Sequence, residues 1–262
     1  SKLSESVAEK DKLLEEHNLP VCKQLTWDNK KNDSFNIVKI NQEMSYPIVI
    51  KPRSGELGYN VYTDIYNDEE LMKKIKLLQN SGKKDIIIEE QSFGTKYRIF
   101  IVNQQITHIK KENVPTVIGD GKHNINKLIE LYNDNNEHTI KHIDETLIKK
   151  QGYDMNSVVE NMKHVHISNV VSTVNGSKEQ LIDLASVPEE NIKMFIDASK
   201  VVKLNICGID YISKDISAPY KIGNGKIIEI NSNPGFNDKI IFENNSLISH
   251  VMNSLFKPKL YN

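Results

Sequence analysis

The chain of 262 residues carries 34 Lys and Arg against 35 Asp and Glu, so its formal net charge is −1. A chain of this length can bury a full core, either as one large domain or as two smaller lobes. The balanced charge provides no overall field that would attract nucleic acid or an anionic membrane, so neither partner is expected. Cys22 and Cys207 have no disulfide or metal-ligand spacing, and no apolar run reaches the roughly 20 residues that span a bilayer. These features predict a cytoplasmic location.

The N-terminal part of the chain predicts one helix and one buried strand. Residues 4–21 place apolar side chains among charged ones ahead of Pro20, which indicates a short helix. Residues 24–45 are expected to be a polar connection. The apolar run at 46–52 indicates a buried strand, and the glycine-bearing loop after it, at 53–61, is typical of a ligand contact.

A strong helix pattern follows this loop. Asn67 and Glu70 have the spacing of a capping box, in which each side chain accepts a hydrogen bond from a free backbone amide. Leu71, Ile75 and Leu78 then share one helical face. The segment is predicted to be an amphipathic helix.

The central part of the chain predicts a strand, a hairpin and a second amphipathic helix. Residues 85–90 form a short apolar run, and residues 97–109 alternate like a hairpin that turns near Asn103 and Gln104. Residues 118–133 combine a glycine-flanked turn with apolar residues at the i, i+3, i+4 and i+7 positions of a helix.

The C-terminal half predicts a polar region, a helix and two strands. Residues 134–165 are expected to form exposed loops with a short helix near 143–148. Residues 187–202 have a proline in the first turn and an apolar stripe, which predicts a helix that packs on a sheet. Residues 206–213 and 226–235 are predicted to be the last pair of core strands.

The last two predicted strands carry three oxygen-bearing side chains. Because alternate residues of a strand share a face, Glu229 and Asn231 point the same way. A glycine-rich connection allows the strands to pair in antiparallel order, which can set Asp210 beside Glu229. Oxygen donors of this kind suit Mg²⁺, which binds few protein ligands and fills its octahedron with water and phosphate. The alternative is that Asp210 and Glu229 are solvated residues on the open face of a sheet.

The segments that carry these residues, CGIDYISKDISAP and IIEINSNPGF, resemble the end of the ATP-grasp ligases, where Asp, Glu and Asn bind Mg²⁺-ATP. Within that family the nearest pattern is the ATP-grasp module of cyanophycin synthetase and bifunctional glutathione synthetase. The resemblance implies an α+β fold, in which two lobes with antiparallel sheets clasp ATP. It also implies ATP and Mg²⁺ as cofactors, with two magnesium ions and with Mn²⁺ as a possible substitute. The pattern is carried by GTKYRIFIV, VIGDGKHNINKLIELYN, IDETLIKKQGYDMNSV and SNVVST.

The resemblance also implies a set of nucleotide-binding residues. YPIVIKP resembles the strand whose lysine contacts the phosphates, RSGELGYNV the mobile loop that closes over them, and IIIEEQSFG the hinge that cups adenine. At the ribose-binding position, where the family usually has an acid, this chain has Lys96. The lysine expected on the first helix corresponds to Lys10 or Lys12. The implied contacts are Lys10, Lys51, Gly55, Gly58, Glu89, Glu90 and Lys96.

The domain organisation and the reaction follow from the same resemblance. It implies a leading helix and connection at 1–45, a small ATP-grasp lobe at 46–92 and a large lobe with the metal site at 93–262. The implied reaction joins a carboxylate to an amine at the expense of ATP, through an acyl phosphate, on an amino acid or peptide. Arg98 and Lys51 are the implied catalytic residues. Two alternatives stay open: a degenerate module that binds nucleotide or a partner protein without turnover, and an ATP-grasp reaction of the glutathione-synthesis type.

Several smaller features have two interpretations each. The turn GDGKH at 119–123 is either a simple helix cap or a site for an anionic substrate. His164 and His166 are interpreted as solvated strand residues rather than metal ligands, and Cys207 as a buried structural residue. Because the family usually has further sequence before this module, a homo-oligomer or a separate preceding domain is expected to complete the site.

Overall fold

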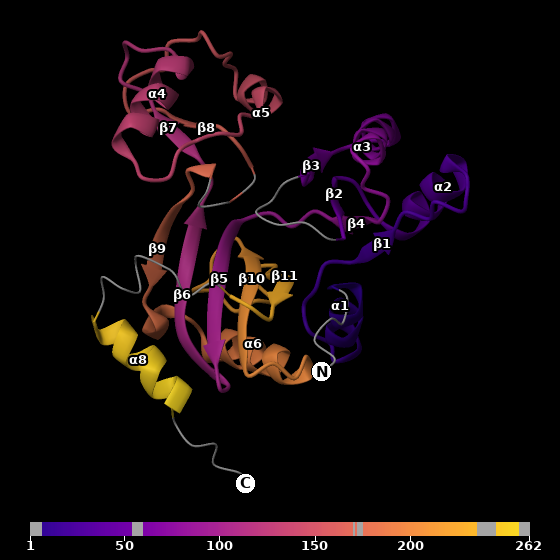
Figure 1. Cartoon of the computed structure of the whole chain (residues 1–262), viewed down its shortest axis with the longest axis vertical. Coiled ribbons are helices and arrows are strands. Elements are labelled where there is room, and N and C mark those ends of the chain that lie inside the picture. The colour runs from indigo at the N-terminus through magenta and orange to yellow at the C-terminus, as the bar shows by residue number, and fades with distance from the viewer. Residues whose placement is uncertain (1–6, 54–59, 170, 172–174, 235–244, 257–262) are drawn as a thin grey trace. The chain divides into compact units, whose positions relative to one another are not determined.

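The computed structural model describes residues 7–53, 60–169, 171, 175–234 and 245–256 (Figure 1). The chain divides into two compact units, each made of separate segments. Unit 1 comprises Ser1–Tyr46, Ile88–Lys111 and Gln180–Asn262, and unit 2 comprises Pro47–Ile87 and Glu112–Glu179. These units do not follow the boundaries expected at residues 45 and 92. The assignment of ATP-binding lobes stays a prediction, because a compact unit is not the same thing as a lobe that clasps a ligand.

Unit 1 is built on a five-stranded sheet with the strand order β11-β10-β5-β6-β9. The strands β5 and β6 form the hairpin expected from the sequence, and Asn103 and Gln104 turn it with φ of 49° and 61°. The strands are β5 (Thr95–Val102), β6 (Gln105–Asn113), β9 (Lys178–Ile182), β10 (Ile206–Ser213) and β11 (Lys226–Asn231). The helices of this unit are α1 (Val7–Glu16), α2 (Asp33–Glu43), α6 (Glu189–Val201) and α8 (Asn245–Phe256), with a 3₁₀ turn, η2, at Leu184–Ser186.

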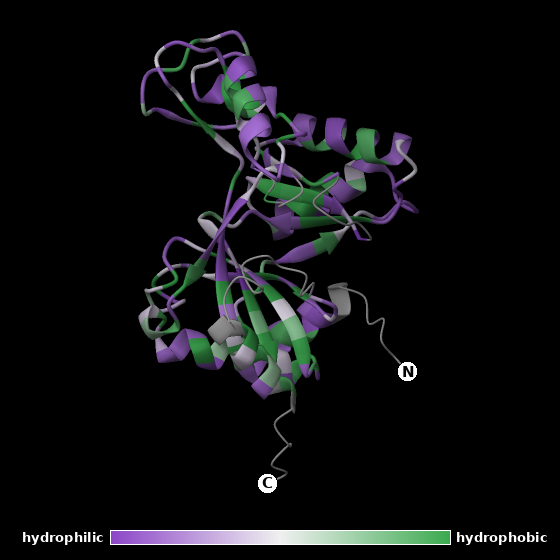
Figure 2. Cartoon of the chain, turned by 60° about the vertical axis from the view of Figure 1, so that its left-hand side comes forward, coloured by the Kyte–Doolittle hydropathy of each residue, from purple (hydrophilic) through white to green (hydrophobic). Residues whose placement is uncertain are grey.

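One face of the five-stranded sheet carries the core of unit 1. Helix α6 packs on it, and the edge of the Phe195 ring meets the ring of Tyr211 with 4.9 Å between centroids. Alternate residues of β5 and β10, such as Ile99 and Ile209, are fully buried against the helix. Figure 2 shows long green, hydrophobic stretches along the central strands of this sheet. The other face of the same strands is therefore free to carry polar side chains.

Unit 2 combines two groups of elements. In the first, β2 and β3 form part of a four-stranded sheet ordered β1-β4-β2-β3, and Leu71, Ile75 and Leu78 bury one face of helix α3. In the second, helices α4 and α5 share a core with the paired strands β7 and β8. The bounds of these elements are β1 (Gln24–Thr26), β2 (Ile48–Pro52), β3 (Tyr62–Ile65), α3 (Asp68–Asn80), β4 (Ile86–Glu90), β7 (Thr116–Ile118), α4 (Ile125–Asn135), α5 (Glu145–Lys150) and β8 (His164–His166). By residue number, β1 and the last three residues of β4 belong to unit 1.

Most of the predicted elements are confirmed, and one prediction is wrong. Residues 24–45 are not a polar connection, because they contain strand β1 and helix α2. The Asn32 side chain accepts a hydrogen bond from the Phe35 amide and caps this helix, while Ile40 is buried. The helix has only a narrow apolar side, so periodicity did not reveal it. Within the described residues, none of the helices is both long and apolar enough to cross a membrane.

Candidate active site

Three neighbouring strands of unit 1 bring the predicted metal and catalytic residues onto one face of the sheet. In β10, Asp210 lies opposite Arg98 of β5 on one side and opposite Glu229 of β11 on the other. Asn231 is two residues after Glu229 on β11, and Lys96 is two residues before Arg98 on β5, so their side chains point to the same side of the sheet. The expected antiparallel pairing of Asp210 with Glu229 is confirmed. We call Lys96, Arg98, Asp210, Glu229 and Asn231 the polar face.

The Asp210 carboxylate is held between two cations. Its Oδ2 atom lies 3.0 Å from the Lys96 ammonium, and its Oδ1 atom lies 2.8 Å from Nε of Arg98. The Asp210 side chain is 7% exposed, whereas both cations are 22% exposed. A carboxylate removed from water is stable only when opposite charges compensate it, and two cations do so here.

The Asn231 amide links Arg98 to Glu229. In the orientation that satisfies both neighbours, its nitrogen donates to Oε1 of Glu229 at 3.0 Å. Its oxygen then accepts from Nη1 of Arg98 at 2.8 Å. Arg98 thus contacts two different strands: its Nε forms an ion pair with Asp210 on β10, and its Nη1 donates to Asn231 on β11.

Gly208 provides the space in which Arg98 lies, and the sequence did not single it out. A Cβ atom at this position would be 2.9 Å from Cβ of Pro234 and 3.0 Å from Nη1 of Arg98. A glycine inside a strand often marks such a close approach, so the glycine in ICGID was the available signal.

A second group of side chains lies on β5 and β6. Phe100 is two residues from Arg98 on the same side of β5, and its ring stacks on His108 with 4.1 Å between centroids. The Lys110 ammonium lies 5.2 Å from the centre of the Phe100 ring. These three side chains are buried, and they extend the side of the sheet that carries the polar face.

Three predicted nucleotide contacts lie in other parts of unit 1. The Lys10 ammonium on α1 donates to the backbone oxygen of Ile230 at 3.3 Å, next to the polar face. The buried Glu89 carboxylate accepts from Nε2 of Gln24 at 2.9 Å. Glu90 is half-buried at the end of β4. Their roles in binding nucleotide stay predictions.

The remaining predicted contacts belong to unit 2. Lys51 is half-buried in β2, as its position at the end of an apolar strand suggests. Gly55 and Gly58 lie outside the described residues. Farther along, the Asn169 amide donates to Oδ2 of Asp64 at 2.6 Å, and Asp64 has an unusual φ of 57°. This contact joins strand β3 to the SNVVST segment that follows β8.

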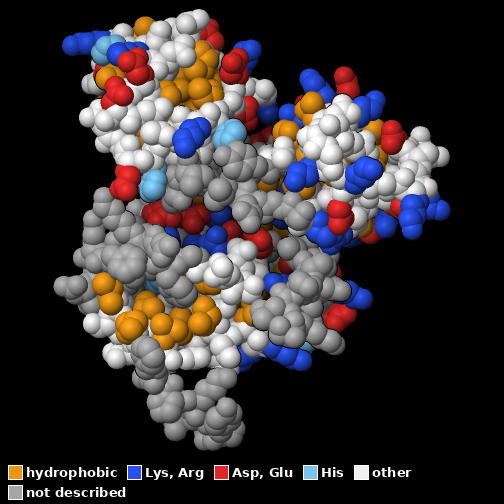
Figure 3. All heavy atoms as spheres, viewed as in Figure 1, with side chains coloured by type: hydrophobic (Ala, Val, Ile, Leu, Met, Phe, Trp, Pro, Cys, Tyr) orange, Lys and Arg blue, Asp and Glu red, His pale blue; other side chains and the backbone are white. Residues whose placement is uncertain are grey.

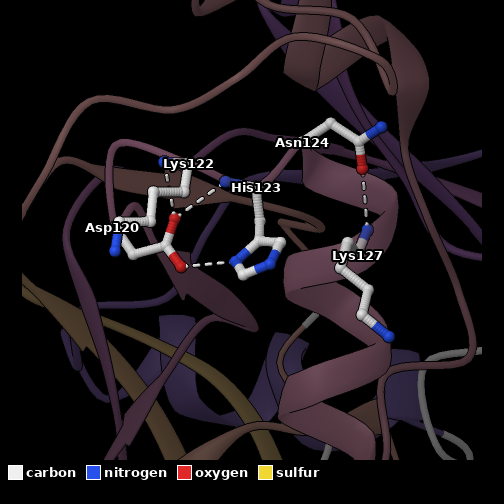
Figure 4. A network of polar contacts seen from close by, with 5 residues as sticks. All are labelled: Asp120, Lys122, His123, Asn124 and Lys127. Carbon is white, nitrogen blue, oxygen red and sulfur yellow. Dashed lines mark hydrogen bonds and ion pairs between the residues drawn. The ribbon is translucent and has the colours of Figure 1, made fainter.

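The GDGKH turn is closed by its own hydrogen bonds (Figure 4). The Oδ1 atom of Asp120 accepts from the amides of Lys122 and His123, both at 2.9 Å, and its Oδ2 atom lies 2.6 Å from Nδ1 of His123. These contacts, chiefly the His123 amide, hold the pKa of the Asp120 carboxyl well below its usual range. Asn124 caps helix α4 by accepting from the Lys127 amide. The interpretation of residues 119–123 as a simple turn is confirmed, but the helix cap is the next residue, Asn124. The interpretation as an anion site stays a prediction.

The expected positions of His164 and His166 on an exposed strand, and of Cys207 in the core, are confirmed. His164 and His166 are exposed on β8, and Nδ1 of His166 lies 2.9 Å from Oγ1 of Thr116. Cys207 is fully buried, which raises the pKa of its thiol to about 12. Among the described residues, no group of three or more His, Cys, Asp or Glu side chains is arranged to hold a metal. A metal on the polar face therefore needs the Asn231 amide or phosphate oxygens besides the two carboxylates.

Ion pairs also occur elsewhere in the part of the chain that the structure describes. In the described residues, acidic and basic side chains are interspersed over the face seen in Figure 3. The ion pairs of Lys127 with Glu130 and of Lys200 with Asp197 are between exposed side chains of single helices. Exposed ion pairs of this kind contribute little to stability, so their effect on the free energy of unfolding can be compared with that of the buried Asp210 ion pairs.

The chain is similar to ligases that are much longer. No protein-family model matches it. It is 28% identical to cyanophycin synthetase of Crocosphaera subtropica over 230 residues, which are 82% of this chain and 26% of that protein. It is 26% identical to the glutathione biosynthesis bifunctional protein GshAB of Clostridium perfringens over 238 residues, 85% of this chain and 31% of that protein. The chain thus spans between a quarter and a third of these two relatives.

Solved structures show the same fold at low sequence identity. D-alanine–D-alanine ligase from Bacillus anthracis aligns with a TM-score of 0.58 and 15% identity, covering 95% of this chain and 66% of the ligase. The ATP-grasp ligase PsnB aligns with a TM-score of 0.53 and 13% identity, covering 95% of this chain and 58% of PsnB. The chain therefore has the α+β ATP-grasp fold, and the proteins that it resembles in sequence and structure are ATP-grasp ligases, which form carbon–nitrogen bonds.

Proposed function

We propose that the chain forms an amide bond between a carboxylate and an amine of amino-acid or peptide substrates, with ATP as the energy source. The observation that carries this proposal is the convergence of Arg98, Asp210, Glu229 and Asn231 from three strands onto one face. The relatives named as cyanophycin and glutathione synthetases support amide ligation in general.

The proposed reaction has two steps. A carboxylate oxygen of the first substrate attacks the γ-phosphorus of ATP, which forms an acyl phosphate and releases ADP. The amine nitrogen of the second substrate then attacks the carbonyl carbon, phosphate leaves, and the amine loses a proton. Catalysis of this type depends on charge neutralisation and positioning more than on a protein nucleophile.

The residues of the polar face fit Mg²⁺ by the chemistry of their donors. Asp210, Glu229 and Asn231 offer oxygen atoms on adjacent strands, and Mg²⁺ prefers oxygen ligands. When bound, the metal would neutralise phosphate charge. The Asn231 oxygen that accepts from Arg98 would serve as a ligand only after the amide turns, so the carboxylates are the primary holders in this proposal.

Arg98 is the proposed contact for the acyl phosphate. Its guanidinium is held by Asp210 and Asn231, so the remaining N–H groups have a fixed direction. A planar, fixed guanidinium matches the oxygens of a phosphoryl group better than a flexible ammonium does. Lys51 is proposed to neutralise charge on the same group. The nucleotide contacts proposed with them are Lys10, Gly55, Gly58, Glu89, Glu90 and Lys96.

The setting and the partners are part of the same proposal. We expect the reaction in the cytoplasm, and in the structure Cys22 and Cys207 are not joined in a disulfide. Because the chain spans only 26% of one cyanophycin synthetase, a separate domain or a second copy is proposed to complete the substrate site. Neither nucleic acid nor a membrane is a proposed partner, since the formal net charge is −1.

A substrate screen with matched variants tests the function. The chain is mixed with ATP, Mg²⁺ and pairs of amino acids or peptides, and phosphate release and product mass are measured. Glu229→Gln is expected to lower turnover by about 100-fold, the usual effect of removing one charge-stabilising group. Glu190→Gln, on helix α6, removes a carboxylate from a surface ion pair and should leave turnover unchanged. Full turnover in Glu229→Gln would contradict the assignment of the polar face.

A second function is favoured by one contact. The Lys96 ammonium already neutralises Asp210, as would suit a module that binds nucleotide or a partner protein without turnover. In that case calorimetry would detect binding of a non-hydrolysable ATP analogue, but no substrate pair would release phosphate. Phosphate release with any carboxylate and amine would exclude this alternative.

A further inference from the structure

The positively charged Lys96 side chain lies at the predicted metal site. Its ammonium lies 3.0 Å from Oδ2 of Asp210, and the lysine side chain keeps 22% of its surface exposed. Strand alternation directs it to the same side as Arg98, so it points onto the polar face. The ammonium therefore contacts a carboxylate proposed as a metal ligand while part of the side chain stays open to a ligand.

The charges of the polar face are already balanced without a metal. Lys96 and Arg98 supply two positive charges, and Asp210 and Glu229 supply two negative ones. A Mg²⁺ ion bound to Oδ2 of Asp210 would lie about 2 Å from that oxygen. Its distance from the ammonium could then be at most about 5 Å, where a divalent and a monovalent cation repel strongly in a partly buried site.

An ammonium can perform part of what a metal ion does at this position. It is a compact charge with three donors, so one N–H can bond Asp210 while another bonds a phosphate oxygen. We propose that the Lys96 ammonium takes the place of one of the two divalent cations, so that the chain binds ATP with a single metal ion. This inference rests on the proposed nucleotide site. Glu229 would hold the remaining ion, with Asn231 as a further ligand once its amide turns, and Lys96 would join the Asp210 carboxylate to the phosphates.

Counting bound metal ions tests the inference without any measurement of turnover. The full chain is saturated with a non-hydrolysable ATP analogue and titrated with Mn²⁺, and free Mn²⁺ is followed by electron paramagnetic resonance. The wild-type chain is expected to bind one Mn²⁺. Lys96→Met should bind two, with the second ion held at least about tenfold more tightly than by the wild type, because the repelling charge is gone. Lys96→Gln tests the same point if Lys96→Met does not fold.

Two control variants separate charge from side-chain shape. Lys96→Arg keeps the positive charge and should still bind one Mn²⁺. Lys200→Met removes a lysine from an exposed ion pair on α6 and should also bind one.

Three results would overturn the inference, and they are distinguishable. A wild-type chain that binds the analogue with two Mn²⁺ ions would overturn it and leave the proposed function intact. A single ion of unchanged affinity in both Lys96→Met and Lys96→Gln would have the same meaning. A wild-type chain that gives no calorimetric binding of the analogue would overturn the proposed function and the inference together.

Discussion

Asp210 and Asp120 are both carboxylates with several partners, but the partners come from different distances along the chain. Those of Asp210 are Lys96 and Arg98 on another strand, and they hold a side chain that is 7% exposed. The partners of Asp120 are Lys122 and His123, only two and three residues farther along the chain, and its side chain is 40% exposed. The buried carboxylate of Asp210 thus depends on cations that tertiary folding brings close, whereas the exposed carboxylate of Asp120 is satisfied by residues next to it in the sequence.

The largest effect is expected from Asp210→Asn, which removes the charge that Lys96 and Arg98 share. Two cations would remain without their counter-charge, so the free energy of unfolding should fall by about 1–3 kcal/mol in urea denaturation. Phosphate release in the ligase assay should fall by about 100-fold. Asp197→Asn breaks an exposed ion pair with Lys200 and should change stability by less than about 0.5 kcal/mol. Equal effects of the two variants would remove the distinction between buried and exposed charges.

Gly208→Ala tests whether the fold, and not only charge, positions Arg98. The new Cβ would lie 2.9 Å from Cβ of Pro234 and 3.0 Å from Nη1 of Arg98, so the side chains that hold the guanidinium in place must shift. We expect phosphate release to fall by about tenfold, because a small misplacement of a positioning group weakens catalysis. Gly82→Ala is the matched control, since its Cβ would meet nothing within 4 Å although its φ is +81°. An unchanged rate in Gly208→Ala would show that Arg98 does not need this space.

Asn67→Ala tests a local interaction that the sequence predicted. The Asn67 side chain accepts from the Glu70 amide at 2.9 Å, and Glu70 in turn accepts from the Tyr66 amide at 2.8 Å. Loss of the cap should lower the free energy of unfolding by about 1 kcal/mol, as measured by urea denaturation. Asn67→Ser keeps an acceptor at the same place and should recover most of the loss. A larger loss in Asn67→Ser than in Asn67→Ala would contradict the capping role.

The smallest effect is expected at Asp120, where pH is the variable. Its pKa is lowered from an ordinary value of 3.8, so its contribution to stability is complete above that pH and declines as pH falls toward the folded-state pKa. Nuclear magnetic resonance of the Asp120 carboxyl carbon should show a titration midpoint below 3.8. His123→Ala keeps the amide, which is the largest cause of the shift, so the midpoint should rise only part of the way. A midpoint at or above 3.8 in the wild-type chain would contradict the hydrogen bonds of Asp120 with Lys122 and His123.

The local features were the ones that could be predicted from the sequence. The cap at Asn67 and the turn at Asn103 and Gln104 depend only on residues that are close in the sequence, so a short sequence segment is enough to predict them. The pairing of Asp210 with Glu229 was also predictable, because alternation and a glycine-rich connection restrict the register of two adjacent strands. Helix α2 was missed because Asn32 gave a cap signal without a wide apolar face behind it.

By itself, the sequence determined that three oxygen donors stand on two paired strands and that the chain resembles the ATP-grasp ligases. Only the tertiary structure decided that Lys96 and Arg98 hold the Asp210 carboxylate and that Gly208 makes room for the guanidinium. The reason is physical. Alternation along one strand fixes the direction of a side chain, whereas the distance between charges on β5 and β10 depends on which strands become neighbours.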